Sequence, residues 1–269
     1  MSDEKKGFEV SSSLAIIIAG GLIALAIFLK DSSVLGTSKG NDISTTQGAT
    51  ISPTVATAAK SLKVGDSVTL GNTSAKVTVY VFSDFQCPYC AASEGADNAL
   101  AKSFKAQGNW EASEPKLKEY ASAGKILLVF KNYPFLGGDS KLNDESGWTA
   151  NAAMCANEQG KFWEMHNLIF SKQPLDASGN PQENKGAFTK DNLKGFAKSL
   201  GLDTQKFNDC LDKNKYQAQI VAEKAEGDAA AKELGQPGLG TPAYFINGEL
   251  TSGAVPWSVL QPLIDQKLK

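Results

Sequence analysis

Two cysteines separated by two residues constrain the fold of this chain more than any other feature. The motif is Cys87-Pro88-Tyr89-Cys90, and it lies between an alternating apolar stretch typical of a strand, residues 77–82, and a helix-forming segment, residues 91–104. Cys87 therefore falls at the N-terminus of a predicted helix, where unpaired N–H groups and the helix dipole stabilise a thiolate. Cys90 lies one turn further along, where it can attack a mixed disulfide formed at Cys87. The pattern predicts a redox-active dithiol.

Two other interpretations of this pair are half of a zinc site and two ordinary buried thiols. A structural zinc site usually needs a second close pair of ligands, whereas the remaining cysteines, Cys155 and Cys210, are far apart in the chain. The only histidine, His166, shares a predicted helix face with Phe162 and Ile169, which favours a structural role over an acid–base one. We therefore expect no metal and no cofactor.

Further strands are predicted on both sides of a long helical region. Residues 126–130 form the short apolar run of a buried central strand, and the strand–helix–strand order predicts that it pairs in parallel with residues 77–82. Residues 243–246 predict another strand, which turns at Asn247-Gly248 into residues 249–251. The predicted fold class is α/β, with a central mixed sheet flanked by helices.

The helical region is predicted as an insertion into this sheet, at about residues 140–235. Thr189 and Asp203 are predicted N-caps within it. A closing helix is predicted to begin at Pro256, since proline suits the first helical turn. The sequence contains no evident internal repeat.

The N-terminal part of the chain predicts a membrane anchor. Residues 10–29 contain no charge, and at roughly 1.5 Å per residue they can span about 30 Å of hydrocarbon. The alternative is a cleavable signal peptide, but its small-x-small match, Ala24-Leu25-Ala26, lies inside the apolar run. We expect residues 1–9 to form a cytoplasmic tail, residues 30–60 a flexible Ser/Thr/Gly linker, and residues 61–269 the folded domain.

The charge of the chain excludes one class of partner. The formal net charge is -2, the isoelectric point is near 5.6, and the sequence contains no basic stripe. We therefore expect no nucleic-acid partner.

Three segments together resemble the DsbA-like thioredoxin family, especially its membrane-tethered branch. They are residues 82–90, residues 155–166 and residues 238–248, and the resemblance covers about residues 65–269. It implies a thioredoxin fold with a helical insertion, in which Cys87 is the nucleophile and Cys90 resolves. It also implies that Thr241-Pro242 is a cis-proline loop facing the active site, where the backbone of Thr241 pairs with an extended substrate segment.

The resemblance implies an extracytoplasmic thiol:disulfide oxidoreductase that oxidises cysteine pairs of exported proteins. Its partners would be those proteins and a membrane thiol oxidase or quinone-linked reoxidant, and its place the outer face of the cytoplasmic membrane, on a single span. One alternative is a reductase or isomerase of the same fold, which differs in redox form and not in motif. The other is a non-catalytic, tethered thiol- or metal-binding module.

Two positions depart from the family pattern. Many members have an acidic residue where this chain has Val81, so the proton relay to the buried cysteine is absent or displaced. Asp84 and Glu164 are candidate substitutes, although solvated carboxylates are the simpler interpretation of both. The strongest oxidants of the family have histidine in place of Tyr89, and a neutral tyrosine lends no positive charge to the Cys87 thiolate. A milder oxidant is therefore expected.

A second disulfide is predicted between Cys155 and Cys210. Both lie on apolar faces of predicted helices in the insertion, and similar widely spaced pairs occur in some members of the family. The alternative is two separate buried thiols, since free cysteine is commonly buried.

Overall fold

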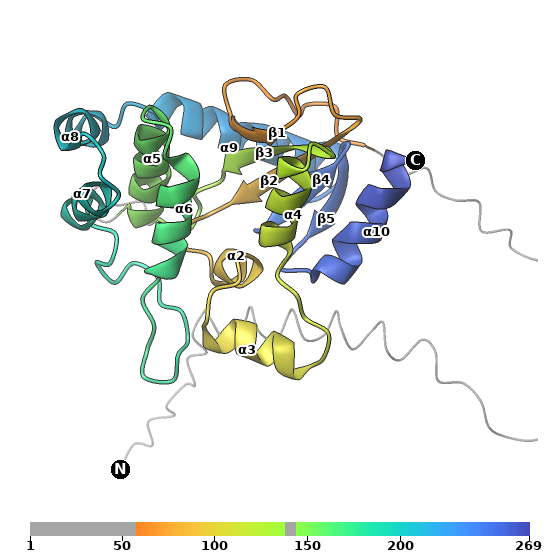
Figure 1. Cartoon of the computed structure of the whole chain (residues 1–269), viewed down its shortest axis with the longest axis horizontal. Coiled ribbons are helices and arrows are strands. Elements are labelled where there is room, and N and C mark those ends of the chain that lie inside the picture. Colours follow the sequence, from red (N-terminus) through yellow and green to blue (C-terminus); the bar gives the residue numbers. More distant parts are fainter. Residues whose placement is uncertain (1–57, 138–143) are drawn as a thin grey trace, which may run out of the picture. The chain divides into compact units, whose positions relative to one another are not determined.

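The computed structural model of the chain describes residues 58–137 and 144–269, and its centre is a five-stranded mixed sheet (Figure 1). The strands are β1 (Val68–Gly71), β2 (Val77–Ser83), β3 (Ile126–Asn132), β4 (Ala243–Ile246) and β5 (Glu249–Ser252). Their order is β1-β3-β2-β4-β5, with β2 and β3 parallel and the other neighbours antiparallel. The predicted parallel pair and the β4–β5 hairpin are confirmed. At the hairpin Asn247 and Gly248 have φ of 50° and 89°, as a two-residue turn requires.

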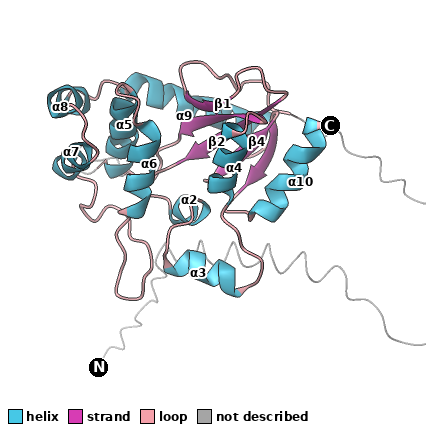
Figure 2. Cartoon of the chain, in the orientation of Figure 1, coloured by secondary structure: helices cyan, strands magenta, loops and turns pink. Residues whose placement is uncertain are grey.

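Helices cover both faces of this sheet (Figure 2). They are α4 (Ser113–Ser122), α9 (Gln217–Glu233) and α10 (Trp257–Leu268). Val79 and Val81 of β2 point to the face covered by α4 and α10. Tyr80 and Phe82 point to the opposite face, where they pack with residues of α9. Alternate residues of β2 thus enter two different apolar layers, one on each face of the sheet, and neither face of this strand is exposed to solvent.

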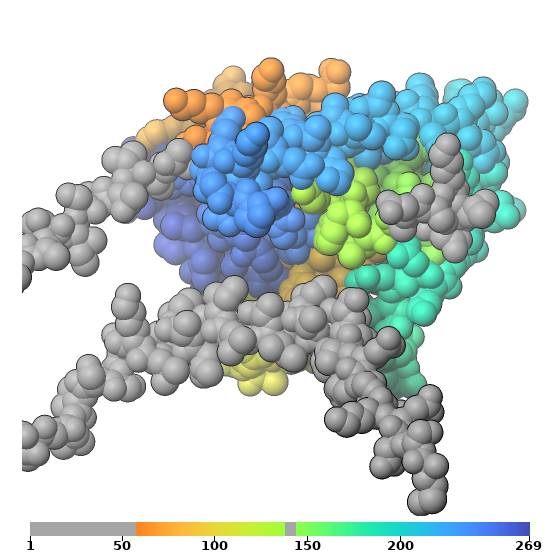
Figure 3. Space-filling view, turned by 180° about the vertical axis from the view of Figure 1, so that it is seen from behind, coloured from red at the N-terminus to blue at the C-terminus, as the bar shows by residue number. Residues whose placement is uncertain are grey.

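Helix α9 approaches β2 closely because it carries a glycine at the contact. A Cβ atom at Gly227 would lie 2.9 Å from Cε1 of Phe82, closer than carbon atoms pack. The segment from residue 58 onward runs beside α9, as the orange and light-blue atoms in Figure 3 show. The backbone N–H groups of Lys60 and Lys63 donate to Glu233 and Glu226, each over 2.5 Å. Contacts with the domain therefore begin before residue 61.

Four helices of the insertion gather at one end of the sheet, and α10 lies at the other (Figure 1). They are α5 (Glu145–Asn157), α6 (Phe162–Ser171), α7 (Lys190–Ser199) and α8 (Thr204–Asp212). Both predicted N-caps are confirmed, since the side chain of Thr189 accepts from the Asn192 N–H and that of Asp203 from the N–H groups of Gln205 and Lys206. These helices share one apolar core with Phe85, Cys87 and Cys90.

The prediction of one helix over residues 91–104 is wrong. The structure has two helices there, α2 (Pro88–Ser93) and α3 (Ala99–Ala106). The chain leaves the first at Gly95, whose φ of +87° is a conformation that other residues rarely adopt. The side chain of Asn98 then caps the second by accepting from the Ala101 N–H at 2.8 Å. This break bears on the site, because it brings Glu94 to the end of α2.

The predicted anchor and tail, residues 10–29 and 1–9, lie outside the described residues, as does most of the predicted linker. Among the helices of residues 58–137 and 144–269, none combines the length and the apolar character that a membrane span needs.

Candidate active site

The two cysteines of the motif lie where β2 passes into α2. Cys87 is the N-cap residue, with extended backbone (φ -67°, ψ 121°), and Pro88 begins the helix. The carbonyl of Cys87 accepts from the Ala91 N–H at 3.0 Å, which fixes the first turn. Both cysteines are free thiols, with 3% of Cys87 and 1% of Cys90 exposed. Both cysteines thus lie within the apolar core beside the insertion.

The Thr241-Pro242 loop faces this pair because β2 and β4 are neighbours in the sheet. Phe82 pairs with Ala243, so the residues that follow β2 meet the residues that precede β4. The Thr241-Pro242 peptide bond is cis. The Sγ atom of Cys87 lies 3.4 Å from the carbonyl oxygen of Thr241. Two of the three segments that carry the family resemblance, residues 82–90 and 238–248, therefore meet at Cys87.

The surroundings shift the pKa values of the two thiols in opposite directions. Burial raises the pKa of Cys87, but hydrogen bonding from Cys90 and from Thr241 outweighs it, and the net pKa is lowered. Burial raises the pKa of Cys90 well above its usual value, and the hydrogen bond and charge of Cys87 raise it further. When one proton is removed from the reduced pair, it therefore leaves Cys87. The arrangement provides a nucleophilic thiolate at Cys87. Cys90 remains a thiol and reacts only after another group has accepted its proton.

Tyr89 lies on the outside of the motif, with 40% of its surface exposed. Its ring centroid lies 6.3 Å from that of Phe104, which in turn lies 4.4 Å from Trp110. The residue thus extends an aromatic surface beside Cys87 and adds no charge to it. Stabilisation of the Cys87 thiolate rests on hydrogen bonds.

The two carboxylates considered as substitutes at Val81 have other contacts. The buried Asp84 accepts from the backbone N–H groups of Phe135 and Leu136, at 2.8 and 3.0 Å, and from the Ser146 hydroxyl. Burial raises the pKa of Asp84 while these hydrogen bonds oppose the rise, so this side chain organises the loop beside the motif. Glu164 is exposed and pairs with Lys161 over 2.7 Å.

A buried ion cluster that the sequence did not reveal lies at the end of α2. Oε2 of Glu94 lies 2.8 Å from Nζ of Lys118, and Oε1 lies 3.3 Å from Nε2 of His166. Burial and the charge of Lys118 hold the pKa of His166 well below its usual value, so its ring is neutral. Nδ1 of His166 lies 3.0 Å from the Asn167 side-chain oxygen, whereas Nε2 makes no hydrogen bond within the described residues. Glu94 lies four residues after Cys90, a spacing that puts two residues on the same face of a helix. This spacing was the signal in the sequence that pointed to Glu94.

No metal cluster accompanies this site: across the described ranges, no three side chains of His, Cys, Asp or Glu are grouped as metal ligands. His166 instead lies among aromatic rings, with centroid distances of 5.4 Å to Phe85 and 5.0 Å to Phe170. Its position is that of a core histidine.

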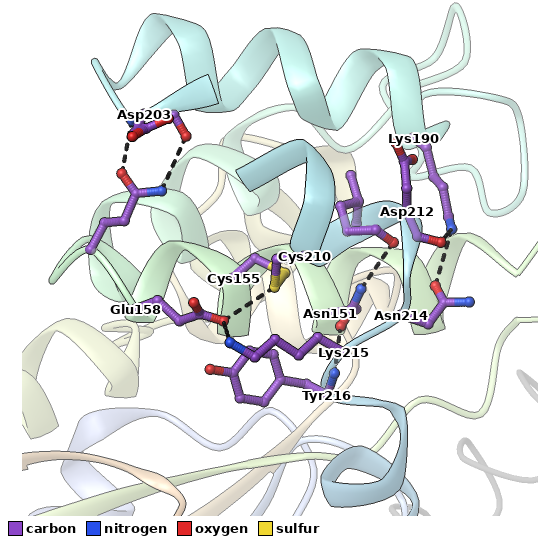
Figure 4. The surroundings of a disulfide bond; sticks show 12 residues. Asn151, Cys155, Glu158, Lys190, Asp203, Cys210, Asp212, Asn214, Lys215 and Tyr216 are labelled. Atoms are coloured by element: carbon purple, nitrogen blue, oxygen red, sulfur yellow. Dashed lines mark hydrogen bonds and ion pairs between the residues drawn. A yellow bond between two sulfur atoms is a disulfide. The ribbon is translucent and has the colours of Figure 1, made fainter. Parts of the chain in front are cut away.

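Cys155 and Cys210 form a disulfide that joins α5 to α8 (Figure 4). Their Cα atoms are 5.9 Å apart, and 55 positions separate them in the sequence. Glu158 lies beside the bond and pairs with Lys215 over 2.9 Å. This bridge lies between the helices of the insertion and not at the Cys87-Pro88-Tyr89-Cys90 motif.

The fold and the paired thiols define a class of protein. Residues 63–266 match the family model described as Thioredoxin, and the chain therefore belongs to this family. The resemblance to DsbA-like proteins predicted from the sequence is confirmed by its relatives. The chain is 28% identical over 204 residues to the probable disulfide bond formation protein D of Bacillus anthracis, covering 74% of this chain and 77% of that protein.

Two further comparisons describe the same fold and a second context for the domain. The crystal structure of oxidised BdbD from Bacillus subtilis superimposes with a TM-score of 0.55 at 20% identity, covering 75% of this chain and 92% of that one. The Na(+)/H(+) antiporter NhaA 1 of Salinispora arenicola is 27% identical over 184 residues. That match covers 68% of this chain but only 22% of the antiporter.

Proposed function

We propose that the protein is a thiol:disulfide oxidoreductase that oxidises cysteine pairs of exported proteins, with Cys87 as nucleophile and Cys90 as resolving thiol. The observation that carries the proposal is the placement of two free thiols at the start of α2, with Sγ of Cys87 3.4 Å from the carbonyl oxygen of Thr241 in the Thr241-Pro242 loop. A stabilised Cys87 thiolate makes Cys87 the better leaving group, and a disulfide that includes it is readily transferred.

The oxidation of a substrate proceeds in two exchanges. A substrate thiolate attacks Sγ of Cys87 in the Cys87–Cys90 disulfide, the S–S bond breaks, and Cys90 leaves with the electron pair and takes up a proton. The second substrate thiolate then attacks the substrate sulfur of the mixed disulfide, and Cys87 leaves as a thiolate. The substrate loses two electrons, which the protein holds as a dithiol. The backbone of Thr241 is proposed to pair with the extended substrate segment during both exchanges.

The proposed setting is the outer face of the cytoplasmic membrane. Residues 10–29 would form the span, residues 1–9 the cytoplasmic tail and residues 30–60 the tether of the domain, residues 61–269. A membrane thiol oxidase or quinone-linked reoxidant would restore the disulfide. Two arguments support this setting. Residues 10–29 are uncharged and long enough to span a membrane, and a disulfide donor would have no use in a reducing cytosol. Protease added to intact spheroplasts should digest the domain, and a soluble protein with a new N-terminus after Ala26 would contradict the anchor.

The activity is tested by transfer of the disulfide to a reduced peptide with two cysteines. The oxidised full chain should convert the peptide stoichiometrically, with one peptide disulfide formed for each Cys87–Cys90 pair reduced. Cys87→Ser should form none, whereas Cys155→Ser/Cys210→Ser should transfer at the wild-type rate. Equal transfer by wild type and Cys87→Ser would contradict the proposal.

The alternatives predict different results in the same assay. A reductase or isomerase would be found with Cys87 and Cys90 reduced in cells and would reduce a peptide disulfide faster than it forms one. A non-catalytic binding module would retain the peptide without changing its redox state.

A further inference from the structure

The position of the missing acidic residue has a polar neighbour across the sheet. Val81 of β2 pairs with Tyr244 of β4, and both side chains point to the face that α4 covers. Side chains of directly paired residues lie about 5 Å apart at Cβ. The Tyr244 side chain therefore lies next to position 81, near enough to Cys90 to interact with it.

Two hydroxyl groups in this region have no regular hydrogen-bond partner among the described residues: those of Tyr244 and Ser93. Both residues are fully buried. Ser93 lies three residues after Cys90, on the same face of α2, and is close enough to lower the pKa of the Tyr244 phenol. Buried hydroxyl groups normally have a hydrogen-bond partner, because desolvation without one is costly. With no such partner in the described ranges, these two hydroxyls are free to pass a proton.

Glu114 of α4 is a carboxyl group beside the Tyr244 phenol. It is buried, and it interacts with the Tyr244 phenol and with Glu94. The neighbouring groups lead to solvent: Glu94, Pro115 and Lys118 line a surface pocket of 270 Å³. Polar groups thus lie between the interior beside Cys90 and the surface pocket between α2, α4 and α6.

We infer that Glu114 exchanges the Cys90 proton through the hydroxyls of Tyr244 and Ser93, in place of the carboxylate that is missing at Val81. The inference rests on the proposed function, since it concerns a step of that reaction. When Cys90 leaves as a thiolate, the carboxyl of Glu114 gives it a proton through the hydroxyls and regains one from the pocket. When Cys90 attacks a mixed disulfide at Cys87, the same route carries its proton to the Glu114 carboxylate. Glu114 acts through the hydroxyls and does not touch either sulfur.

The charges around Glu114 suit this exchange. Burial, and then the charge of Glu94, raise the pKa of Glu114 to about 8, while Lys118 and Tyr244 oppose the rise. Burial and the Glu114 charge raise the pKa of Tyr244 well above its usual value, so the phenol passes protons without ionising. On α10, the nearest carboxylate, Asp265, contacts Tyr120 and not Glu114. A carboxyl that titrates near pH 8 can both donate and accept close to neutral pH.

The test measures the attack of Cys90 on a mixed disulfide of known chemistry. The reduced full chain is purified in mild detergent and reacts with 5,5′-dithiobis(2-nitrobenzoate): the Cys87 thiolate attacks, the S–S bond of the probe breaks, one coloured thionitrobenzoate leaves and the other stays linked to Cys87. Cys90 then attacks the Cys87 sulfur, the S–S bond to the probe breaks, and the second thionitrobenzoate is released while the Cys90 proton stays with the protein; this second, slower release is the one measured. The release is followed by stopped flow between pH 6 and 10 in wild type, Glu114→Gln, Tyr244→Phe and the exposed α4 control Glu119→Gln.

We expect the wild-type release to rise with pH through an inflection near 8. Glu114→Gln and Tyr244→Phe should each slow the release by about 10²-fold above pH 8, the lower end for general acid–base catalysis, and Glu114→Gln should remove the inflection. Glu119→Gln should match wild type. Wild-type kinetics in a folded Glu114→Gln, or in Tyr244→Phe if the first variant does not melt cooperatively, would overturn the relay. Failure of wild-type Cys87 to take up the probe would contradict the proposed function instead.

Discussion

The two cysteine pairs of this chain differ in what surrounds them, and the difference explains their different roles. Cys87 and Cys90 lie within one helical turn, beside the Thr241-Pro242 loop, and remain free thiols. Cys155 and Cys210 lie 55 positions apart and join α5 to α8. The first pair has hydrogen-bonding groups that stabilise one reduced sulfur. The second pair closes a long loop, and its bond stabilises the fold because it restricts the unfolded chain.

The largest expected effect comes from exchanging one sulfur of the first pair. Cys87→Ser should lower disulfide transfer to a dithiol peptide to the rate of buffer, because serine cannot form the mixed disulfide. Cys155→Ser/Cys210→Ser, the matched control, should keep the wild-type rate. Loss of transfer in a folded form of the control variant would mean that the two pairs do not have separate roles.

Loss of the Cys155–Cys210 bridge should lower the stability of the folded protein. Removing the bridge with Cys155→Ser/Cys210→Ser should lower the free energy of unfolding by about 4 kcal/mol, the chain-entropy figure for a loop of this length, which spans 55 positions. Urea unfolding in non-reducing buffer measures it. Under the same conditions Cys87→Ser/Cys90→Ser should change stability much less than the bridge does. A bridge-free protein as stable as wild type would contradict the structural role.

The buried carboxyl behind Cys90 should make stability depend on pH. Since burial raises the pKa of Glu114 from 4.5 to about 8, the folded protein keeps a proton that the unfolded chain releases. The bound proton therefore contributes to the free energy of unfolding. This contribution is complete below pH 4.5 and is lost as the pH rises through 8. Between these limits wild type should lose about 3 kcal/mol more than Glu114→Gln, less than the full pKa difference implies, because Glu94 titrates with Glu114.

Urea titrations of both proteins at pH 5 and pH 9 provide the measurement, with Glu119→Gln as the exposed control on the same helix. Parallel pH dependence in wild type and Glu114→Gln would show that this carboxyl titrates normally.

The smallest expected effect concerns the redox potential of the first pair. Since Tyr89 supplies no charge, the potential should lie between about -120 mV and about -270 mV, the values of a strong oxidant and of thioredoxin. Tyr89→His should raise it by about 30 mV, the equivalent of lowering the Cys87 pKa by about one unit. Equilibration with glutathione buffers measures both proteins, while thiolate absorbance titrates Cys87. A wild-type potential at or below that of thioredoxin would favour the reductase alternative.

Local patterns in the sequence were sufficient to predict much of the fold. Alternating and continuous apolar runs predicted β2 and β3, and the Asn247-Gly248 turn predicted the final hairpin. The caps at Thr189 and Asp203 were also predictable, because each depends on a side chain and backbone N–H groups two or three residues away.

Features that depend on long-range pairing were not predictable. The strand β1 has only four residues, and its place beside β3 is set by tertiary packing. The sequence revealed that Val81 breaks the family pattern, but only the register of β2 and β4 places Tyr244 opposite it. Likewise Glu114 resembles any helical glutamate in the sequence, and its burial follows from how α4 packs on the sheet. A helix-breaking role for Gly95 could have been considered from its sequence alone.

The central claim, that disulfides are exchanged through Cys87 while the other pair remains structural, is tested most directly by trapping the covalent intermediate. Cells that express the full chain as Cys90→Ser are quenched in acid, free thiols are alkylated, and the cross-linked peptides are identified by mass spectrometry. The account predicts exported proteins linked through Cys87, with Cys155 still joined to Cys210. Adducts that pass through Cys155 or Cys210, or a Cys87 that is alkylated in every molecule, would contradict it.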